Sequence, residues 1–162
     1  MLTNQNVKFV VMLSTKSQNR GSTTTEVLDT AGYNEALIVY NLGDMSPSGL
    51  AQGFEIQESD DNSVWTSIDQ ATVGNAACVG IDGTAITAAD ITTQDSVLVF
   101  NLDLAKRKRY LRGEINNGLG NNRFSCYALL GVPSNLGDIN SAKMVLSFST
   151  GTEAYVRVPV GG

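Results

Sequence analysis

The chain has 162 residues, of which 42% are hydrophobic and 17% charged, and its formal net charge at pH 7 is −5. A chain of this size and composition can bury a sizeable core as one domain, and its composition argues against disorder. The negative charge argues against a protein that binds nucleic acid by neutralising phosphates, and no apolar run approaches the length of a membrane span.

The sequence reads as a succession of short β-strands. In the first apolar run, 7–13, alternate residues fall on one face, which is the period of a strand: Val7, Phe9, Val11 and Leu13. This run is too short for a secretion signal, so we expect a chain that is made and used without secretion. Runs of β-branched or alternating apolar residues predict later strands at 36–42, 54–57, 64–68, 96–102, 107–115, 123–132, 144–148 and 154–158.

Polar and glycine-rich segments separate these strands. Residues 18–25 read as a polar loop, and 116–122 as a tip rich in Gly and Asn. Long loops of this kind are often contact arms to a neighbouring subunit. The Asp82-Gly83 pair predicts a tight turn. Residues 85–89 are the only segment with modest helix propensity, and a short helix is predicted there.

The stretch 54–69 predicts a β-hairpin. An alternating strand leads into the turn-forming run Ser-Asp-Asp-Asn-Ser, and β-prone residues resume at Val64. We expect Val64, Thr66 and Ile68 to share one face of the second strand. Trp65, the only tryptophan, would lie on the other face.

Nine or ten short strands, regular turn signals and the lack of a convincing long helix predict an all-β fold. An antiparallel β-sandwich, best arranged as a jelly roll with long polar loops, lets so many short strands share one core. We expect one domain over 1–162. Within it, 1–25 would be an extended N-terminal strand or arm and 159–162 a flexible C-terminal tail.

The chain contains two cysteines and no histidine. Cys78 and Cys126 both lie in apolar company, so we expect two small buried thiols, with a disulfide as the less favoured alternative. Two thiols without histidine cannot make a typical zinc site. The commonest general base is absent, and no phosphate loop or nucleophile elbow occurs. We therefore expect a protein that is not an enzyme and needs no metal or cofactor.

Charge is distributed unevenly along the chain. The segment 53–103 holds nine acidic residues and no basic one, whereas residues 104–162 hold eight basic and three acidic residues. A molecule with one acidic and one basic surface suits ordered association with copies of itself or with a patterned partner. The alternative is that the basic cluster, 106–109, is a solvated turn that guards a strand edge.

Three kinds of candidate site involve residues of the hairpin. Asp60, Asp61 and Asn62 carry oxygen ligands of the kind that calcium prefers, but their spacing is not that of an EF-hand and favours a plain turn. Three aromatic residues could form a sugar-stacking surface, although such residues more often belong to a core or an interface. They are Trp65, Tyr33 and Tyr110. The carboxylates of Glu55, Glu58 and Asp69 could act as a glycosidase pair, but nothing in the sequence places two of them across a cleft.

Three segments together resemble small tailed-phage virion proteins of the cement or head-decoration type, which are built as jelly rolls. The segments are 28–37, 54–61 with Trp65, and 108–112, so the resemblance spans about 26–115. It implies a structural protein, made in the host cytoplasm, that binds the major capsid protein on the outer capsid surface of the virion as a dimer or trimer. We expect a basic segment to face acidic capsid surface: Lys106, Arg107, Lys108, Arg109 and Arg112.

The hairpin with Trp65, followed by 109–112, is also similar to discoidin-type carbohydrate-binding domains. Those domains are β-sandwiches too, but they are usually secreted and often carry a terminal disulfide pair, which this chain lacks. This second resemblance implies glycan adhesion as the alternative function. The hairpin residues Asp60, Asp61, Asn62 and Trp65 would make the contact.

Overall fold

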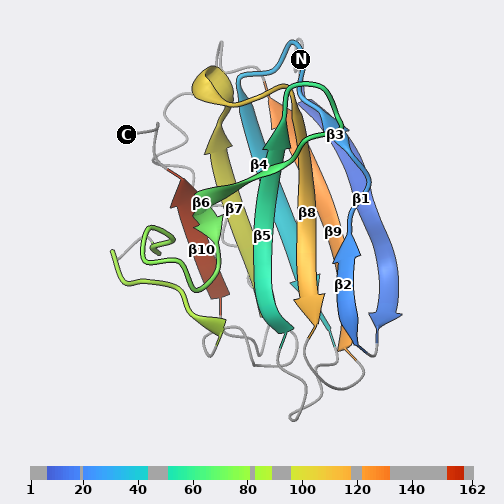
Figure 1. Cartoon of the computed structure of the whole chain (residues 1–162), viewed down its shortest axis with the longest axis vertical. Helices are drawn as coiled ribbons and strands as arrows, with labels where there is room; N and C mark the ends of the chain where they lie inside the picture. The colour runs from blue at the N-terminus through green and yellow to red at the C-terminus, as the bar shows by residue number, and fades with distance from the viewer. Residues whose placement is uncertain are drawn as a thin grey trace, which may run out of the picture.

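The computed structural model describes residues 7–18, 20–43, 51–80, 83–88, 96–117, 122–131 and 153–158. For residues 51–52, 96 and 153–158 it describes the backbone alone. The regular structure in these ranges is almost entirely β-strand, arranged as two sheets that lie face to face (Figure 1).

Sheet A contains five strands in the order β1-β9-β4-β7-β10. Their bounds are β1 (Val7–Gln18), β9 (Asn122–Gly131), β4 (Glu35–Leu42), β7 (Ser96–Asp103) and β10 (Glu153–Val158). Sheet B follows the order β2-β8-β5-β6, and a short fifth strand, β3, also pairs with β8. The bounds are β2 (Gly21–Thr24), β8 (Tyr110–Asn117), β5 (Ala51–Ser59), β6 (Thr66–Thr72) and β3 (Leu28–Asp29).

Eight of these strands are wrapped as a jelly roll. β1 pairs with β9, β2 with β8, β4 with β7 and β5 with β6, so the pairs are nested from the outside of the chain inward. The contacts of β9 with β4 and of β8 with β5 then complete the two sheets. The predicted all-β sandwich is confirmed, and the nested pairing is that of a double-sheet jelly roll.

Strand β10 departs from the predicted antiparallel arrangement. It runs parallel to β7, with Glu153 opposite Val97 and Val158 opposite Leu102. All other strand pairings in the described ranges are antiparallel. Sheet A is therefore an antiparallel sheet with one parallel strand at its edge, a combination that is common in larger sheets.

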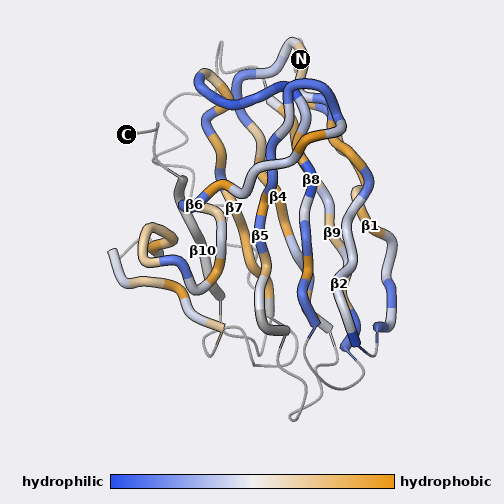
Figure 2. Tube along the Cα trace, viewed as in Figure 1, coloured by the Kyte–Doolittle hydropathy of each residue, from blue (hydrophilic) through white to orange (hydrophobic). Residues whose placement is uncertain are grey.

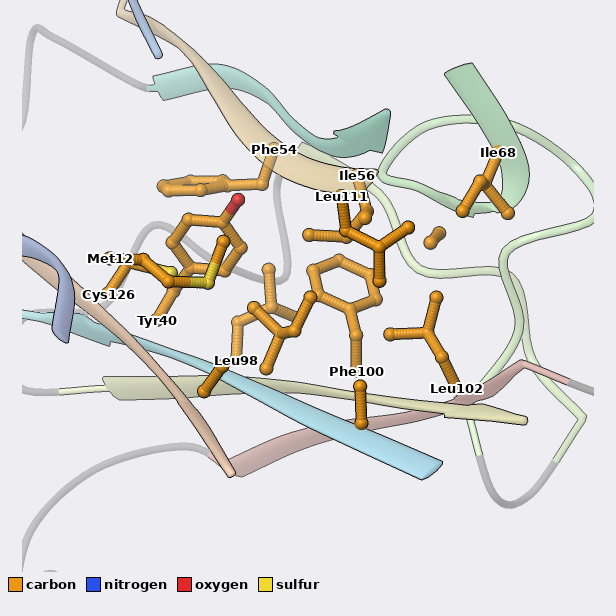
Figure 3. Close-up of a cluster of buried hydrophobic side chains, with 14 of the residues drawn as sticks. Met12, Tyr40, Phe54, Ile56, Ile68, Leu98, Phe100, Leu102, Leu111 and Cys126 are labelled. Atoms are coloured by element: carbon orange, nitrogen blue, oxygen red, sulfur yellow. The ribbon is translucent and has the colours of Figure 1, made fainter. Parts of the chain in front are cut away.

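The core lies between the sheets, because alternate residues of each strand turn towards the opposite sheet (Figure 3). The Tyr40 ring lies near its centre, with its centroid 5.2 Å from that of Phe54 and 6.0 Å from that of Phe100, both edge to face. Gly113 on β8 provides the room that the Tyr40 hydroxyl needs. A Cβ atom at Gly113 would overlap the Tyr40 hydroxyl oxygen and lie 3.0 Å from Cγ2 of Thr25.

The structure corrects two predictions outside the hairpin. Residues 18–25 are not one loop, since β1 continues to Gln18 and Gly21–Thr24 form β2. Threonine has a high β-propensity, so a strand can form here although the neighbouring residues are polar. Of the helix predicted at 85–89, only Ala88 is helical among the described residues, in a 3₁₀ turn, whereas Ala85 forms an antiparallel bridge with Val79. Instead, a short 3₁₀-helix at Leu104–Lys106 follows β7, and the Asp103 carboxylate caps it by accepting from the Ala105 N–H.

Several predicted segments lie outside the described residues. They are the strand at 144–148, the tail at 159–162, residues 1–6 of the N-terminal arm and most of the tip at 116–122.

Candidate functional site

The basic cluster is largely neutralised within the chain. Arg107 lies 3.9 Å from the carboxylate of Glu58, and Lys108 lies 3.5 Å from that of Asp60. These contacts follow from topology, because β8 pairs with β5 and so brings the start of β8 beside the end of β5. The acidic hairpin and the basic segment therefore do not form two separate surfaces, which corrects the interpretation drawn from their separation in sequence.

Arg109, the fourth residue of the cluster, forms a two-pronged ion pair with Asp29. Its Nε donates to Asp29 Oδ1 at 2.9 Å and its Nη2 donates to Oδ2 at 2.7 Å. This pair lowers the pKa of Asp29 from 3.8 to about 2, helped by the Ala31 N–H, and it raises the pKa of Arg109. Lys106 is exposed and has no ion pair among the described residues, so it is the member of the cluster that remains open to a partner.

The hairpin tip is a turn held by Asp61. The Asp61 carboxylate accepts from the N–H groups of Ser63 and Val64 and from the hydroxyls of Ser59 and Ser63. These donors hold the pKa of Asp61 well below its usual range, and the Val64 N–H has the largest effect. Asn62 adopts φ +60° at the apex, a conformation that asparagine tolerates. The carboxylate is thus used by the turn itself, as the plain-turn interpretation expects.

Beyond the tip, the second strand starts later than predicted. β6 begins at Thr66, so Val64 and Trp65 belong to the connection, and Val64 is 67% exposed. Val64 and Thr66 therefore do not share the buried face of Ile68, which is 2% exposed. The connection between β5 and β6 passes over the outer face of sheet B, in front of β8 and β5 (Figure 1). This path brings Trp65 to Arg112, whose guanidinium lies 4.3 Å from the centre of the ring.

Arg112 leads into a chain of polar contacts on the outer face of sheet B. Its Nε donates to Gln57 Oε1 at 2.8 Å, and Gln57 Nε2 donates in turn to Glu55 Oε1 at 2.5 Å and Glu114 Oε2 at 2.9 Å. The side chains of Trp65, Arg112, Gln57, Glu55 and Glu114 are called the outer-face network below. Gln57 and Glu114 were not candidates from the sequence, because only the register of β5 against β8 brings them together.

The other aromatic and acidic candidates do not join this network. Tyr33 packs against the core, and Tyr110 lies under the Arg109 guanidinium at 5.0 Å. Glu58 pairs with Arg107, and the Asp69 carboxylate accepts from the Asn75 amide at 3.2 Å. Each of the three carboxylates considered for glycoside hydrolysis thus has its own partner within the fold.

A second surface lies on strand β1, at the edge of sheet A. Val7, Phe9 and Val11 point away from the core and are 45%, 59% and 50% exposed. We call these three side chains the β1 stripe. The Phe9 ring stacks on Tyr127 of the neighbouring strand at 5.9 Å, and Leu129 lies directly opposite Phe9. Figure 2 shows this first half of β1 as a hydrophobic stretch at the rim of the molecule.

The two cysteines are buried and unpaired, as predicted. Burial raises the pKa of the Cys78 thiol to about 11 and also raises that of Cys126. Within the described part of the chain, no three His, Cys, Asp or Glu side chains are grouped so that they could hold a metal ion. None of its helices is long and apolar enough to cross a membrane.

Comparison with known proteins yields likeness of shape only. No family model matches the chain, and no curated protein matches it in sequence. One similar solved structure is the SPBc2 prophage-derived protein YomS, with a TM-score of 0.46, 8% identity and coverage of 80% of this chain and 97% of that one. Another is a chain of infectious bursal disease virus, Gx strain, with a TM-score of 0.47, 12% identity and 81% of this chain covered. This chain spans 33% of the latter, and at these TM-scores neither likeness identifies a family or a function.

Proposed function

We propose that this chain is a structural virion protein that binds the outer surface of an icosahedral phage capsid as an oligomer and cements neighbouring capsid subunits. The resemblance of three sequence segments to cement proteins suggests the setting. The jelly roll is a fold that viral capsid domains use, although a fold alone carries no function. The observation that carries the proposal is the β1 stripe.

The β1 stripe is an apolar row on a strand at the edge of a sheet, and the irregular pairing of β1 with β9 begins only beyond Val11. Edge strands are normally protected by charge, proline or a bulge, because an apolar edge invites association with another chain. The stripe places the three large apolar side chains in one row, and Phe9 is the most exposed of them. A row of this kind is suited to contact with a second copy of the chain. An oligomer formed in this way can touch several capsid subunits at once, which is what a cement requires.

The ion pairs alter the expected mode of attachment. Because Arg107, Lys108 and Arg109 are engaged within the chain, the basic side chains of the predicted contact that keep free donors are Lys106 and Arg112. The mechanism is mass action: an oligomer that binds only the assembled shell lowers the free energy of that shell and leaves other states unchanged.

The test has two parts, which use the double variant Phe9→Ser/Val11→Ser and the control Val64→Ser. Val64 is apolar and 67% exposed, so its replacement removes a similar surface from the hairpin instead of from β1. In light scattering, the native chain and the control should be dimers or trimers, and the double variant a monomer. A native chain that is monomeric would contradict the role of the stripe.

The second part asks where the protein resides. An antibody against the chain should label the outside of particles produced by the genome that encodes it, and cryo-electron microscopy should show the chain bridging capsid subunits. Added back to particles that lack the chain, the double variant should bind more weakly than the control. Particles that carry no copy of the chain would overturn the proposed function.

A further inference from the structure

The outer face of sheet B has a chemistry that the cement function does not use. We propose that the outer-face network binds a glycan, with Trp65 as its apolar platform and Arg112, Glu55 and Glu114 as its hydrogen-bonding groups. This site lies on the sheet opposite to the β1 stripe. It also differs from the contact predicted from the sequence. The Asp60 carboxylate pairs with Lys108, and the Asp61 carboxylate accepts hydrogen bonds from the turn itself.

The register of the strands sets the positions of the polar groups. Gln57 lies opposite Arg112, and Glu55 lies opposite Glu114, across the pairing of β5 with β8. The intervening residue, Ile56, is completely buried in the core, so these four side chains share the outward face. Gln57 is only 9% exposed and holds the surrounding side chains in place. The polar groups are therefore fixed before any ligand arrives, which lowers the entropy lost on binding.

Each outer group keeps hydrogen-bonding capacity. Glu55 Oε1 accepts from Gln57 and from the Ser67 hydroxyl at 3.1 Å, but Glu55 Oε2 and Glu114 Oε1 accept from no described residue. The Arg112 terminal nitrogens likewise donate to no acceptor within the described ranges, because its one hydrogen bond uses Nε. The site thus presents free acceptors and free donors side by side.

This combination matches hydroxyl groups, which donate and accept at the same time. The three charged side chains sum to −1, so the site disfavours phosphate, sulfate and other anions. Two carboxylates directly opposite each other in a sheet repel, a cost that the Gln57 amide reduces by donating to both. Neighbouring hydroxyls of a sugar ring would donate to the two free carboxylate oxygens and relieve this cost further.

Trp65 supplies the apolar part of the site. The Arg112 guanidinium lies over its ring and fixes its orientation, while the side chain stays partly exposed beside the polar groups. An aromatic surface next to converging polar groups is the usual composition of a small-ligand site. The binding of one sugar on an open sheet face is weak, but many copies on one particle would add strongly through avidity.

The only tryptophan of the chain lies in the proposed site, so its fluorescence reports binding directly. The purified full chain is titrated with chitohexaose, cellohexaose, mannohexaose, dextran and purified O-antigen polysaccharide, and with tetralysine as a basic peptide. At least one glycan should shift the Trp65 emission in a saturable manner. A response to tetralysine alone, or to none of the probes, would overturn the proposal.

Two conservative variants separate binding from folding. Glu114→Gln and Arg112→Gln each remove a charge from the site, and each should weaken glycan binding at least about tenfold, the effect of a lost charged hydrogen bond. Lys106→Gln, which removes a charge outside the network, should bind as the native chain does. Circular dichroism verifies that each variant is folded, and undiminished binding by both site variants would contradict the assignment. Because this experiment needs no capsid, its outcome is independent of the cement function.

Discussion

Arg109 and Asp29 meet side by side although 80 residues separate them in the chain. The pair joins the start of β8 to the two-residue strand β3, whose own ladder consists of Leu28 opposite Leu111 and Asp29 opposite Tyr110. A strand this short has little hydrogen bonding of its own, and the ion pair adds a side-chain contact between it and sheet B. The Thr30 N–H and hydroxyl add to this attachment, as both donate to the Arg109 carbonyl.

The ion pair predicts a pH dependence of stability. The folded pKa of Asp29, about 2, is below its ordinary value of 3.8, so its contribution is fully present above about pH 4 and is lost as the pH falls towards 2. Asp29→Asn should therefore lower the melting temperature at pH 7 by a small amount, because the two side chains are 46% and 54% exposed. Thermal melts of both proteins from pH 7 to pH 2 should show the difference narrowing below pH 4. A difference that stays constant would show that the charge of Asp29 is not its cause.

Gly113 predicts a severe packing defect. Gly113→Ala would drive a methyl group into the Tyr40 hydroxyl, and overpacking of this kind costs about 3 kcal/mol of unfolding free energy. Gly131→Ala is the matched control, since a Cβ there would meet nothing within 4 Å, and urea melts should show little change. Adding Tyr40→Phe should recover part of the loss, so that the two substitutions are not additive. Strict additivity would contradict the proposed contact.

The basic cluster predicts different effects for two neighbouring residues. Arg107→Glu would place a second carboxylate beside Glu58 at a site where both side chains are mostly covered, and it should cost about 2 to 3 kcal/mol. Lys106→Glu should leave stability nearly unchanged because Lys106 is exposed. Denaturant melts measure both. Equal effects at the two positions would show that the Arg107 pair does not contribute to stability.

The buried cysteines predict slow thiol chemistry. Cys78 and Cys126 are covered and their pKa values are raised, so few of these thiols are thiolates at neutral pH. A thiol-specific chromogenic reagent should find no rapidly reacting group in the native protein and two in denaturant. Rapid modification of the folded chain would contradict the burial of the thiol concerned.

The sequence was sufficient to predict where most strands lie, but not which strands pair with each other. Periodicity located β4 and β7 within a residue or two, since their apolar runs are long and rich in β-branched residues. It could not locate β2, whose Gly-Ser-Thr-Thr sequence has no apolar signal and which forms only because β8 offers it a partner. The parallel direction of β10 could not be predicted either, because the alternation of apolar and polar residues is the same in a parallel and an antiparallel strand.

The candidate sites show the same limit. The hairpin and the basic segment were both recognised, but as separate contacts, whereas the pairing of β5 with β8 places them together. Glu55, Gln57, Arg112 and Glu114 are visible in the sequence as polar residues at alternate positions, the sign of an outward strand face. Only the register shows that these two alternating sets touch.

The pairing of β1 with β9 has a consequence during synthesis. β1 leaves the ribosome before β9, which begins to emerge only after about 100 further residues have been made. At ordinary translation rates of about 5 to 20 residues per second, β1 therefore remains without its partner strand for several seconds or longer, with its apolar residues exposed. Nascent chains at this stage are candidates for capture by holding chaperones, and sheet A can close only after β9 has emerged.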